Sequence, residues 1–223
     1  MRAKGSSHAT GASTKKRSPA AGEKVTPARE GRAELRERAS RFFAYAVPAG
    51  TAKQAAAAVT RVTREHHDAT HVAFAWKIGA GDSPRSRCSD AGEPAGTAGP
   101  PILRAVESEG VTDVAVAVAR DFGGRRLGKA GLAGAYGDVA KGALEDAGRV
   151  ARYETVEVVV SCPPDRSGAL RRLLDPPAIR VGEERWEETN GRLRSAIHVR
   201  RSQLDGFLAA LEEAGFPYEA PER

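Results

Sequence analysis

The sequence predicts an α+β fold arranged as two consecutive domains. Its 223 residues exceed one common domain and fall short of a large barrel. Strand-like segments alternate with helix-like segments whose apolar residues recur three and four positions apart. From about Arg152 the pattern begins again as strand, helix, strand, strand and helix, which is typical of a ferredoxin-like unit. We therefore expect folded domains over residues 31–149 and 150–223.

The first domain is expected to place helices rich in small residues against a sheet. Thr51 and Gln54 form a capping-box pattern, and alanine and valine follow at helical spacing. The small apolar run from Asp113 to Ala119 is typical of a central buried strand. In order, we expect strands and helices as follows: a strand at 40–47, a helix at 51–65, strands at 71–78 and 85–88, a helix at 101–109, a strand at 113–119 and a helix at 132–147.

The second domain carries clear turn and stop signals. Pro176 and Pro177 end a helix that is expected over 165–175. Asn190-Gly191 predicts a hairpin between its neighbouring strands. The other expected elements are strands at 155–161, 178–187 and 192–200, a helix at 204–211 and a last short strand near Phe216.

Residues 1–30 are expected to form a disordered basic tail. They contain seven Lys and Arg against two acids, and Val25 is their only large aliphatic residue after Met1. Such a segment buries too little apolar area to offset the entropy of ordering it. Most of the formal charge of +6 therefore belongs to the tail, so the charge of the whole chain is weak support for nucleic-acid binding.

Several classes of protein are not expected. No stretch of 18 apolar residues predicts a membrane span, and no apolar core of a signal peptide follows the first charges, so we expect a cytoplasmic protein. Cys88 and Cys162 are too far apart for a paired-cysteine zinc motif. His66, His67 and His71 match no zinc-ligand spacing. We expect no metal and no cofactor.

Two glycine-rich segments, residues 89–101 and 122–132, contain most of the unusual information. Each lies where a loop meets a helix start, where free backbone N–H groups and the helix dipole can hold an anion. The alternative is that the glycines only allow positive φ angles and close approach, while Asp90 and Glu93 cap turns. Ala130 stands where a Walker A loop needs Ser or Thr, so nucleotide hydrolysis is not expected.

Four segments then occur in a fixed order, and together they resemble the IMPACT family, in particular its bacterial, YigZ-type, two-domain branch. The resemblance covers residues 38–147 for the signature domain and 152–218 for the tail domain. The segments are Ser40-Arg41-Phe42, Asp68-Ala69-Thr70-His71, Ser89-Asp90-x-Gly92-Glu93-Pro94-x-Gly96-Thr97-Ala98-Gly99, and Arg120-x-Phe122-Gly123-Gly124-x-x-Leu127-Gly128-x-x-Gly131-Leu132-x-x-Ala135-Tyr136. The chain departs from the family pattern at Ala91, Ala95, Asp121, Lys129 and Ala130.

The resemblance implies a fold and a role. The N-terminal domain would have the βα fold of a small-subunit ribosomal protein and of domain IV of elongation factor G, and the C-terminal domain would be similar to domain V of that factor. Eukaryotic members regulate translation initiation through protein partners of a stress-responsive kinase. We therefore expect a translation-associated regulatory or binding protein, without catalysis, that contacts the ribosome, RNA or a protein partner.

The expected contact surface is formed by the two glycine-rich loops, with Arg120, Arg125, Arg126 and Lys129 facing phosphates or acids. The alternative is an enzyme that acts on a small anionic substrate, with Asp90 or Glu93 as general base. The complete set of binding candidates is Ser89, Asp90, Gly92, Glu93, Gly96, Thr97, Gly99, Arg120, Phe122, Gly123, Gly124, Arg125, Arg126, Gly128, Lys129, Gly131 and Tyr136.

Overall fold

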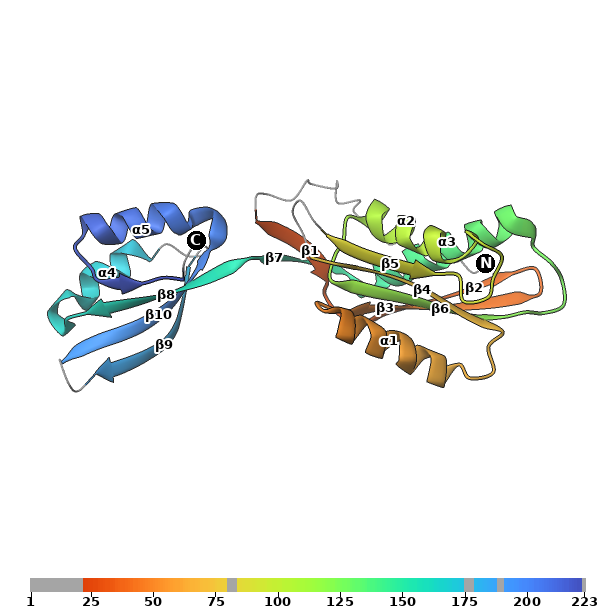
Figure 1. Ribbon diagram of the computed structural model, residues 1–223, viewed down its shortest axis with the longest axis horizontal. Coiled ribbons are helices and arrows are strands. Elements are labelled where there is room, and N and C mark those ends of the chain that lie inside the picture. Colours follow the sequence, from red (N-terminus) through yellow and green to blue (C-terminus); the bar gives the residue numbers. More distant parts are fainter. Residues whose placement is uncertain (1–21, 80–83, 175–178, 188–190, 222–223) are drawn as a thin grey trace, which may run out of the picture.

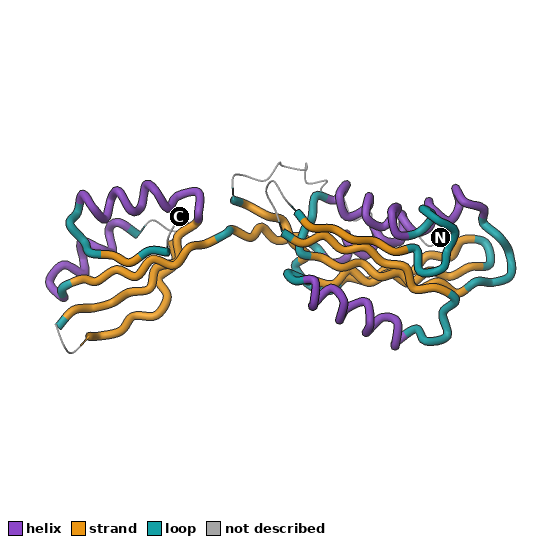
Figure 2. Tube along the Cα trace, viewed as in Figure 1, coloured by secondary structure: helices purple, strands orange, loops and turns teal. Residues whose placement is uncertain are grey.

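The computed structural model describes residues 22–79, 84–174, 179–187 and 191–221. Two lobes lie end to end, and one extended segment connects them where β7 (Arg149–Tyr153) leads into β8 (Thr155–Cys162) (Figure 1). Figure 2 shows helices on both faces of the N-terminal sheet but on only one face of the C-terminal sheet. The mixture of helix and sheet confirms the predicted α+β class.

The N-terminal lobe is built on a five-stranded sheet in the order β2-β3-β6-β4-β5, in which every neighbouring pair is antiparallel. The predicted central position of β6 is confirmed, and its Val114, Val116 and Val118 are fully buried. The strands are β2 (Gly31–Glu37), β3 (Ser40–Pro48), β4 (His71–Ile78), β5 (Arg85–Ser89) and β6 (Val114–Asp121).

Three helices cover this sheet. The helix α1 (Ala52–Glu65) lies on one face, and α2 (Gly99–Glu109) and α3 (Gly128–Ala147) lie on the other (Figure 1). The predicted capping box is present, because the Thr51 hydroxyl accepts from the Gln54 backbone and the Gln54 side chain accepts from the Thr51 backbone. The core consists mainly of alanine and valine, so the helices and the sheet approach closely.

A two-stranded ribbon corrects the prediction of a disordered tail over residues 1–30. The strand β1 (Glu23–Pro27) pairs antiparallel with β7. The Val25 carbonyl also accepts the Thr112 N–H at 2.9 Å, and Lys24 forms an ion pair with Asp113 at 2.6 Å. These partners are distant in sequence, so local composition does not reveal them. Residues 1–21 lie outside the described residues, and the predicted domain boundary at 149/150 falls inside β7.

The C-terminal lobe has a four-stranded sheet in the order β11-β8-β10-β9, with all neighbours antiparallel. The chain order β8, α4, β9, β10, α5 and β11 is that of a ferredoxin-like unit, as predicted. The hydrophobic core of this lobe contains side chains from the sheet and from both helices. Beyond β8, the elements are η1 (Pro164–Arg166), α4 (Ser167–Leu173), β9 (Ile179–Glu187), β10 (Arg192–Arg200), η2 (Arg201–Gln203), α5 (Leu204–Glu213) and β11 (Tyr218–Glu219). Asn190 of the predicted hairpin turn lies outside the described residues.

Candidate functional site

The two glycine-rich loops lie at the same end of the N-terminal sheet. The first loop, residues 90–98, connects β5 to α2, and the second loop, residues 122–127, connects β6 to α3. Since β5 and β6 both run antiparallel to β4, these two strands are parallel in direction and finish at the same end of the sheet. The turn between β2 and β3 lies at this end of the sheet too, because Arg41, near the start of β3, pairs with Asp121 at the end of β6.

Asp90 organises the first loop. Its carboxylate accepts the backbone N–H groups of Gly96, Ala98 and Gly99, each at 2.9 Å. Partial burial alone would raise the pKa of Asp90, but the backbone hydrogen bonds outweigh it, and the pKa is lowered. The carboxylate therefore stays ionised and satisfies the first free N–H groups of α2.

Glu93 is the centre of a buried polar network. Its Oε1 accepts Nη1 of Arg120 at 2.7 Å and the hydroxyl of Tyr136 at 2.8 Å. Nη2 of Arg120 donates to Oγ of Ser40 at 3.1 Å. Burial, followed by the negative charge of Glu93, raises the pKa of the Tyr136 hydroxyl, which therefore remains a donor. The network joins the first loop to β3, β6 and α3.

This network corrects two of the expectations. Arg120 was expected to face a phosphate, but its side chain is 6% exposed and paired with Glu93. A general base needs a carboxylate that can reach a substrate proton. Glu93 is 2% exposed and already holds two donors, while Asp90 holds three backbone N–H groups. Both carboxylates thus hold structural hydrogen bonds, which argues against either one as a general base.

The second loop is packed against the turn between β2 and β3. A Cβ atom on Gly123 would lie 1.7 Å from the carbonyl oxygen of Ala39, so only glycine allows this approach. The N–H of Phe122 donates to the Thr70 hydroxyl at 3.2 Å. Arg38 donates from Nη1 to the carbonyl oxygen of Arg126 at 3.1 Å. The loop is therefore held by two neighbouring turns.

An exposed group of cations, which we call the basic patch, surrounds the second loop. It consists of Arg38, Arg125, Arg126 and Lys129, all of which are exposed. Within the part of the chain that the structure describes, the side chains of Arg125, Arg126 and Lys129 have no acidic partner. The patch adjoins the start of α3, where no side chain caps the helix and the first turn holds no acid. Positive charge and free N–H groups therefore coincide there.

Arg38 is the patch residue that the sequence analysis missed. It lies in the turn between β2 and β3, with a positive φ of 52°. The signal that could have found it is the alternation of Ala33 and Leu35 with charged residues, which indicates a half-buried strand just before the turn.

The predicted site residues thus fall into three groups by exposure. The buried members hold the loops together, and they are Glu93, Thr97, Gly99, Arg120 and Tyr136. Ser89, Asp90 and Gly131 are half-buried. The exposed members are Gly92, Gly96, Phe122, Gly123, Gly124, Arg125, Arg126, Gly128 and Lys129.

His66 and His71, two of the described histidines, have different partners. His66 forms a hydrogen bond of 2.6 Å with the Tyr45 hydroxyl, whereas His71 Nδ1 lies 3.0 Å from the carbonyl oxygen of Ala91. Among the described residues, no three His, Cys, Asp or Glu side chains are grouped as metal ligands would be. Within the same residues, no helix has the length and apolar character needed to cross a membrane.

Comparison with known proteins identifies the family. Residues 38–144 match the family model described as the Impact N-terminal domain. An IMPACT family member from Thermus thermophilus is 42% identical over 135 residues, which cover 60% of this chain and 72% of that protein. The IMPACT family member YigZ of Escherichia coli strain K12 is 36% identical over 136 residues, covering 60% of this chain and 67% of that protein.

A solved structure resembles both lobes. It is described as the crystal structure of a hypothetical protein, and it matches 90% of this chain and 98% of its own length with 27% identity and a TM-score of 0.63. The family model and the two curated relatives agree with the resemblance found in the four ordered segments. The chain therefore belongs to the IMPACT family.

Proposed function

We propose that this chain is a translation-associated regulatory protein that binds RNA through the basic patch, with no catalytic step. The observation that supports this proposal is the coincidence of three unpaired cations with the uncapped start of α3. Arg and Lys side chains and helix N-termini are the groups that proteins use to contact phosphate oxygens.

The shape of the patch favours a phosphate backbone over a small ligand. Arg125 and Arg126 lie on an exposed loop that Gly123 and Arg38 hold in place, and Lys129 follows in the first turn of α3. Exposed cations on a fixed loop can follow successive phosphates without enclosing them. Phe122, which is 43% exposed and has the Arg120 guanidinium 5.2 Å from its ring centre, adds an aromatic face beside the patch.

Family membership supports the link to translation, because the resemblance implies a regulatory role in initiation for eukaryotic members. Ribosomal RNA is then the most abundant ligand of suitable chemistry, and a cytoplasmic location follows from the same role. We also propose that the N-terminal and C-terminal lobes are two domains similar to domains IV and V of elongation factor G. The ferredoxin-like order of the C-terminal strands is consistent with the second likeness.

The test is co-sedimentation of the full chain with ribosomes over a series of salt concentrations. The double substitution Arg125→Glu and Arg126→Glu should weaken binding and reduce the salt dependence. Each lost phosphate contact lowers the slope of log K against log salt by about 0.7 to 0.9. Two lost contacts therefore reduce the slope by about 1.4 to 1.8.

Two control pairs carry the same change in charge. Lys15→Glu with Lys16→Glu alters the basic residues near the N-terminus, and Lys53→Glu with Arg104→Glu alters exposed positions on α1 and α2. Both pairs should bind as the unmodified chain does, within the small effect of net charge. Equal loss in all three pairs means nonspecific attraction, and unchanged binding in the Arg125 and Arg126 pair excludes the basic patch. Sedimentation that survives ribonuclease treatment would indicate a protein partner instead.

A further inference from the structure

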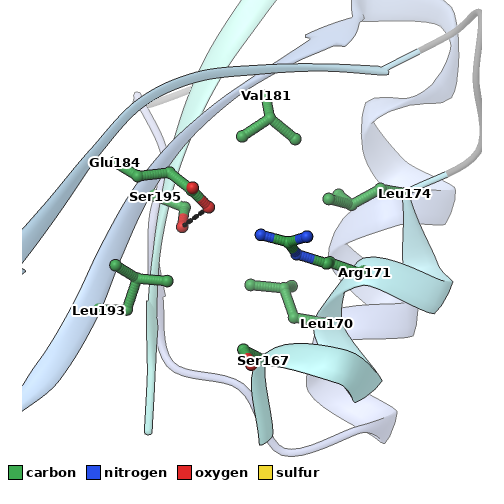
Figure 3. A pocket seen from close by; sticks show the side chains of 8 residues that line it. All are labelled: Ser167, Leu170, Arg171, Leu174, Val181, Glu184, Leu193 and Ser195. Atoms are coloured by element: carbon green, nitrogen blue, oxygen red, sulfur yellow. Dashed lines mark hydrogen bonds between the residues drawn. The ribbon is translucent and has the colours of Figure 1, made fainter. Parts of the chain in front are cut away.

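The C-terminal lobe contains a cavity that the proposed function does not use. Its volume is about 340 Å³, and α4 forms one wall while β9 and β10 form the other (Figure 3). That volume is at the lower end of the range for ligand pockets, which is roughly 300–1,000 Å³. The cavity therefore has room for a molecule the size of a single amino acid.

The walls are largely apolar. Leu170 and Leu174 project from the α4 side, and Val181 and Leu193 face them from the two strands (Figure 3). The hydrophobic core of the lobe includes Leu170, and Leu174 packs against it, but neither Val181 nor Leu193 belongs to that core. Val181 is 47% exposed, which is unusual for a valine within a strand. An apolar group in the cavity would give these side chains the contacts that the core does not supply.

Two opposite charges face each other across this apolar space. The Arg171 guanidinium points into the cavity from α4, and the Glu184 carboxylate lies on the opposite wall (Figure 3). The Glu184 carboxylate accepts a hydrogen bond from the hydroxyl of the buried Ser195 at 3.2 Å. Among the described residues Arg171 has no acidic partner, and it forms no ion pair with Glu184. Each charge therefore has capacity for a further partner.

We propose that this cavity binds a free amino acid with an apolar side chain of about the size of leucine. The carboxylate of the ligand pairs with Arg171, and its ammonium group pairs with Glu184. Its side chain fills the space between Leu170, Leu174, Val181 and Leu193. Both charged side chains are exposed, so a ligand with one charge leaves the other residue to water, whereas a zwitterion pairs with both at once and binds more tightly.

The first test uses three probes that share one side chain. L-Leucine carries both charges, 4-methylpentanoate lacks the ammonium group, and 3-methylbutylamine lacks the carboxylate. Titration calorimetry on the full chain should show binding of L-leucine and at least about tenfold weaker binding of each analogue. Equal affinity for the three probes overturns the proposal, and so does the absence of leucine binding at about 10 mM.

Variants then assign each charge to its residue. Arg171→Gln should bring the affinity for L-leucine down to that for 3-methylbutylamine, because the carboxylate no longer contributes. Glu184→Gln should bring it down to that for 4-methylpentanoate. The matched controls are Arg172→Gln, an exposed neighbour on α4, and Glu183→Gln, which pairs with Arg185 at 2.9 Å. Both controls should bind L-leucine as the unmodified chain does.

Backbone amide chemical shifts of the ¹⁵N-labelled chain locate the ligand independently of affinity. L-Leucine should move the resonances of α4, β9 and β10 and leave those of the N-terminal lobe in place. Shifts confined to the N-terminal lobe, or equal losses in the variants and their controls, would show that the ligand binds elsewhere. These readouts do not involve RNA, so the outcome is separate from that of the ribosome experiment.

Discussion

Glu93 and Arg120 form an ion pair of 2.7 Å in which the two side chains are only 2% and 6% exposed. Glu93 belongs to the first loop and Arg120 to the end of β6, so the pair fixes a loop to the centre of the sheet. Tyr136 and Ser40 complete the network through further hydrogen bonds. Glu93 and Arg120 are therefore buried residues that stabilise the fold, whereas the cations of the basic patch are exposed to solvent.

The first prediction concerns this ion pair. Removing one partner of a buried pair leaves an uncompensated charge and costs about 3–5 kcal/mol of the free energy of unfolding. We expect Glu93→Leu and Arg120→Met each to show such a loss. The double variant should lose clearly less than the sum, because no unpaired charge remains. Urea unfolding monitored by Trp76 fluorescence, in a Trp186→Phe background, measures the free energy of unfolding of each variant. Losses in the double variant that equal the sum of the single losses would contradict the network.

The second prediction concerns Asp90 and pH. Its pKa is lowered in the folded state, so its stabilising effect is complete above the ordinary pKa and is lost as the pH falls through the lowered value. Asp90→Asn should cost about 1 kcal/mol at neutral pH, as loss of a helix cap does. The difference from the unmodified chain should shrink below about pH 4. Asp138→Asn, at an exposed position of α3, is the control, and a difference that stays constant down to pH 2 would argue against this role.

The third prediction compares two glycines. Gly123→Ala places a methyl group on the Ala39 carbonyl and should destabilise the N-terminal lobe by about 2 kcal/mol or more. Gly134→Ala, in open space on α3, should stabilise it by up to about 1 kcal/mol. Gly123→Ala should also weaken ribosome binding, because the basic patch loses its support. Thermal unfolding measures the melting temperature of each variant. Equal melting temperatures for the two variants would contradict the close approach of Gly123 to the Ala39 carbonyl oxygen.

The fourth prediction concerns the ribbon of β1 and β7. Thr26→Pro removes the backbone donor that faces Val150 of β7 and should weaken the pairing of the two strands. Amide hydrogen exchange in Val150–Arg152 should then become faster, while exchange in β6 remains slow. Hydrogen-exchange mass spectrometry of the full chain measures both segments. Unchanged protection in β7 would show that β1 contributes nothing to its stability.

Much of the fold could be predicted because its signals are local. The capping box of α1 and the small apolar run of β6 each lie within a few residues, and both are confirmed. The pairing of β1 with β7 joins residues more than 120 positions apart, so local composition alone predicts that β1 is part of a disordered tail. The strand β2 was not predicted, although the alternation of Ala33 and Leu35 with charged residues is a local signal for it.

The site was harder to predict than the fold. The glycine-rich loops were found, and the alternative role of Asp90 in capping a turn is confirmed by its bonds to the start of α2. Arg120 was predicted to lie on the contact surface because three further cations follow it within the same loop region. Its partner Glu93 lies 27 residues earlier in the chain, and no pattern in the sequence connects them.

The short connection between the lobes has a mechanical consequence. Glu154 alone separates β7 from β8; its N–H donates to the Gly22 carbonyl, and its own carbonyl accepts the N–H of Arg201. Its carboxylate pairs with the Arg201 guanidinium at 2.9 Å. The two backbone hydrogen bonds lie on either side of the Glu154 Cα atom, so the φ and ψ rotations of this residue leave both of them intact. The joint therefore acts as a single-residue hinge, and the backbone of Glu154 sets the direction in which one lobe faces relative to the other.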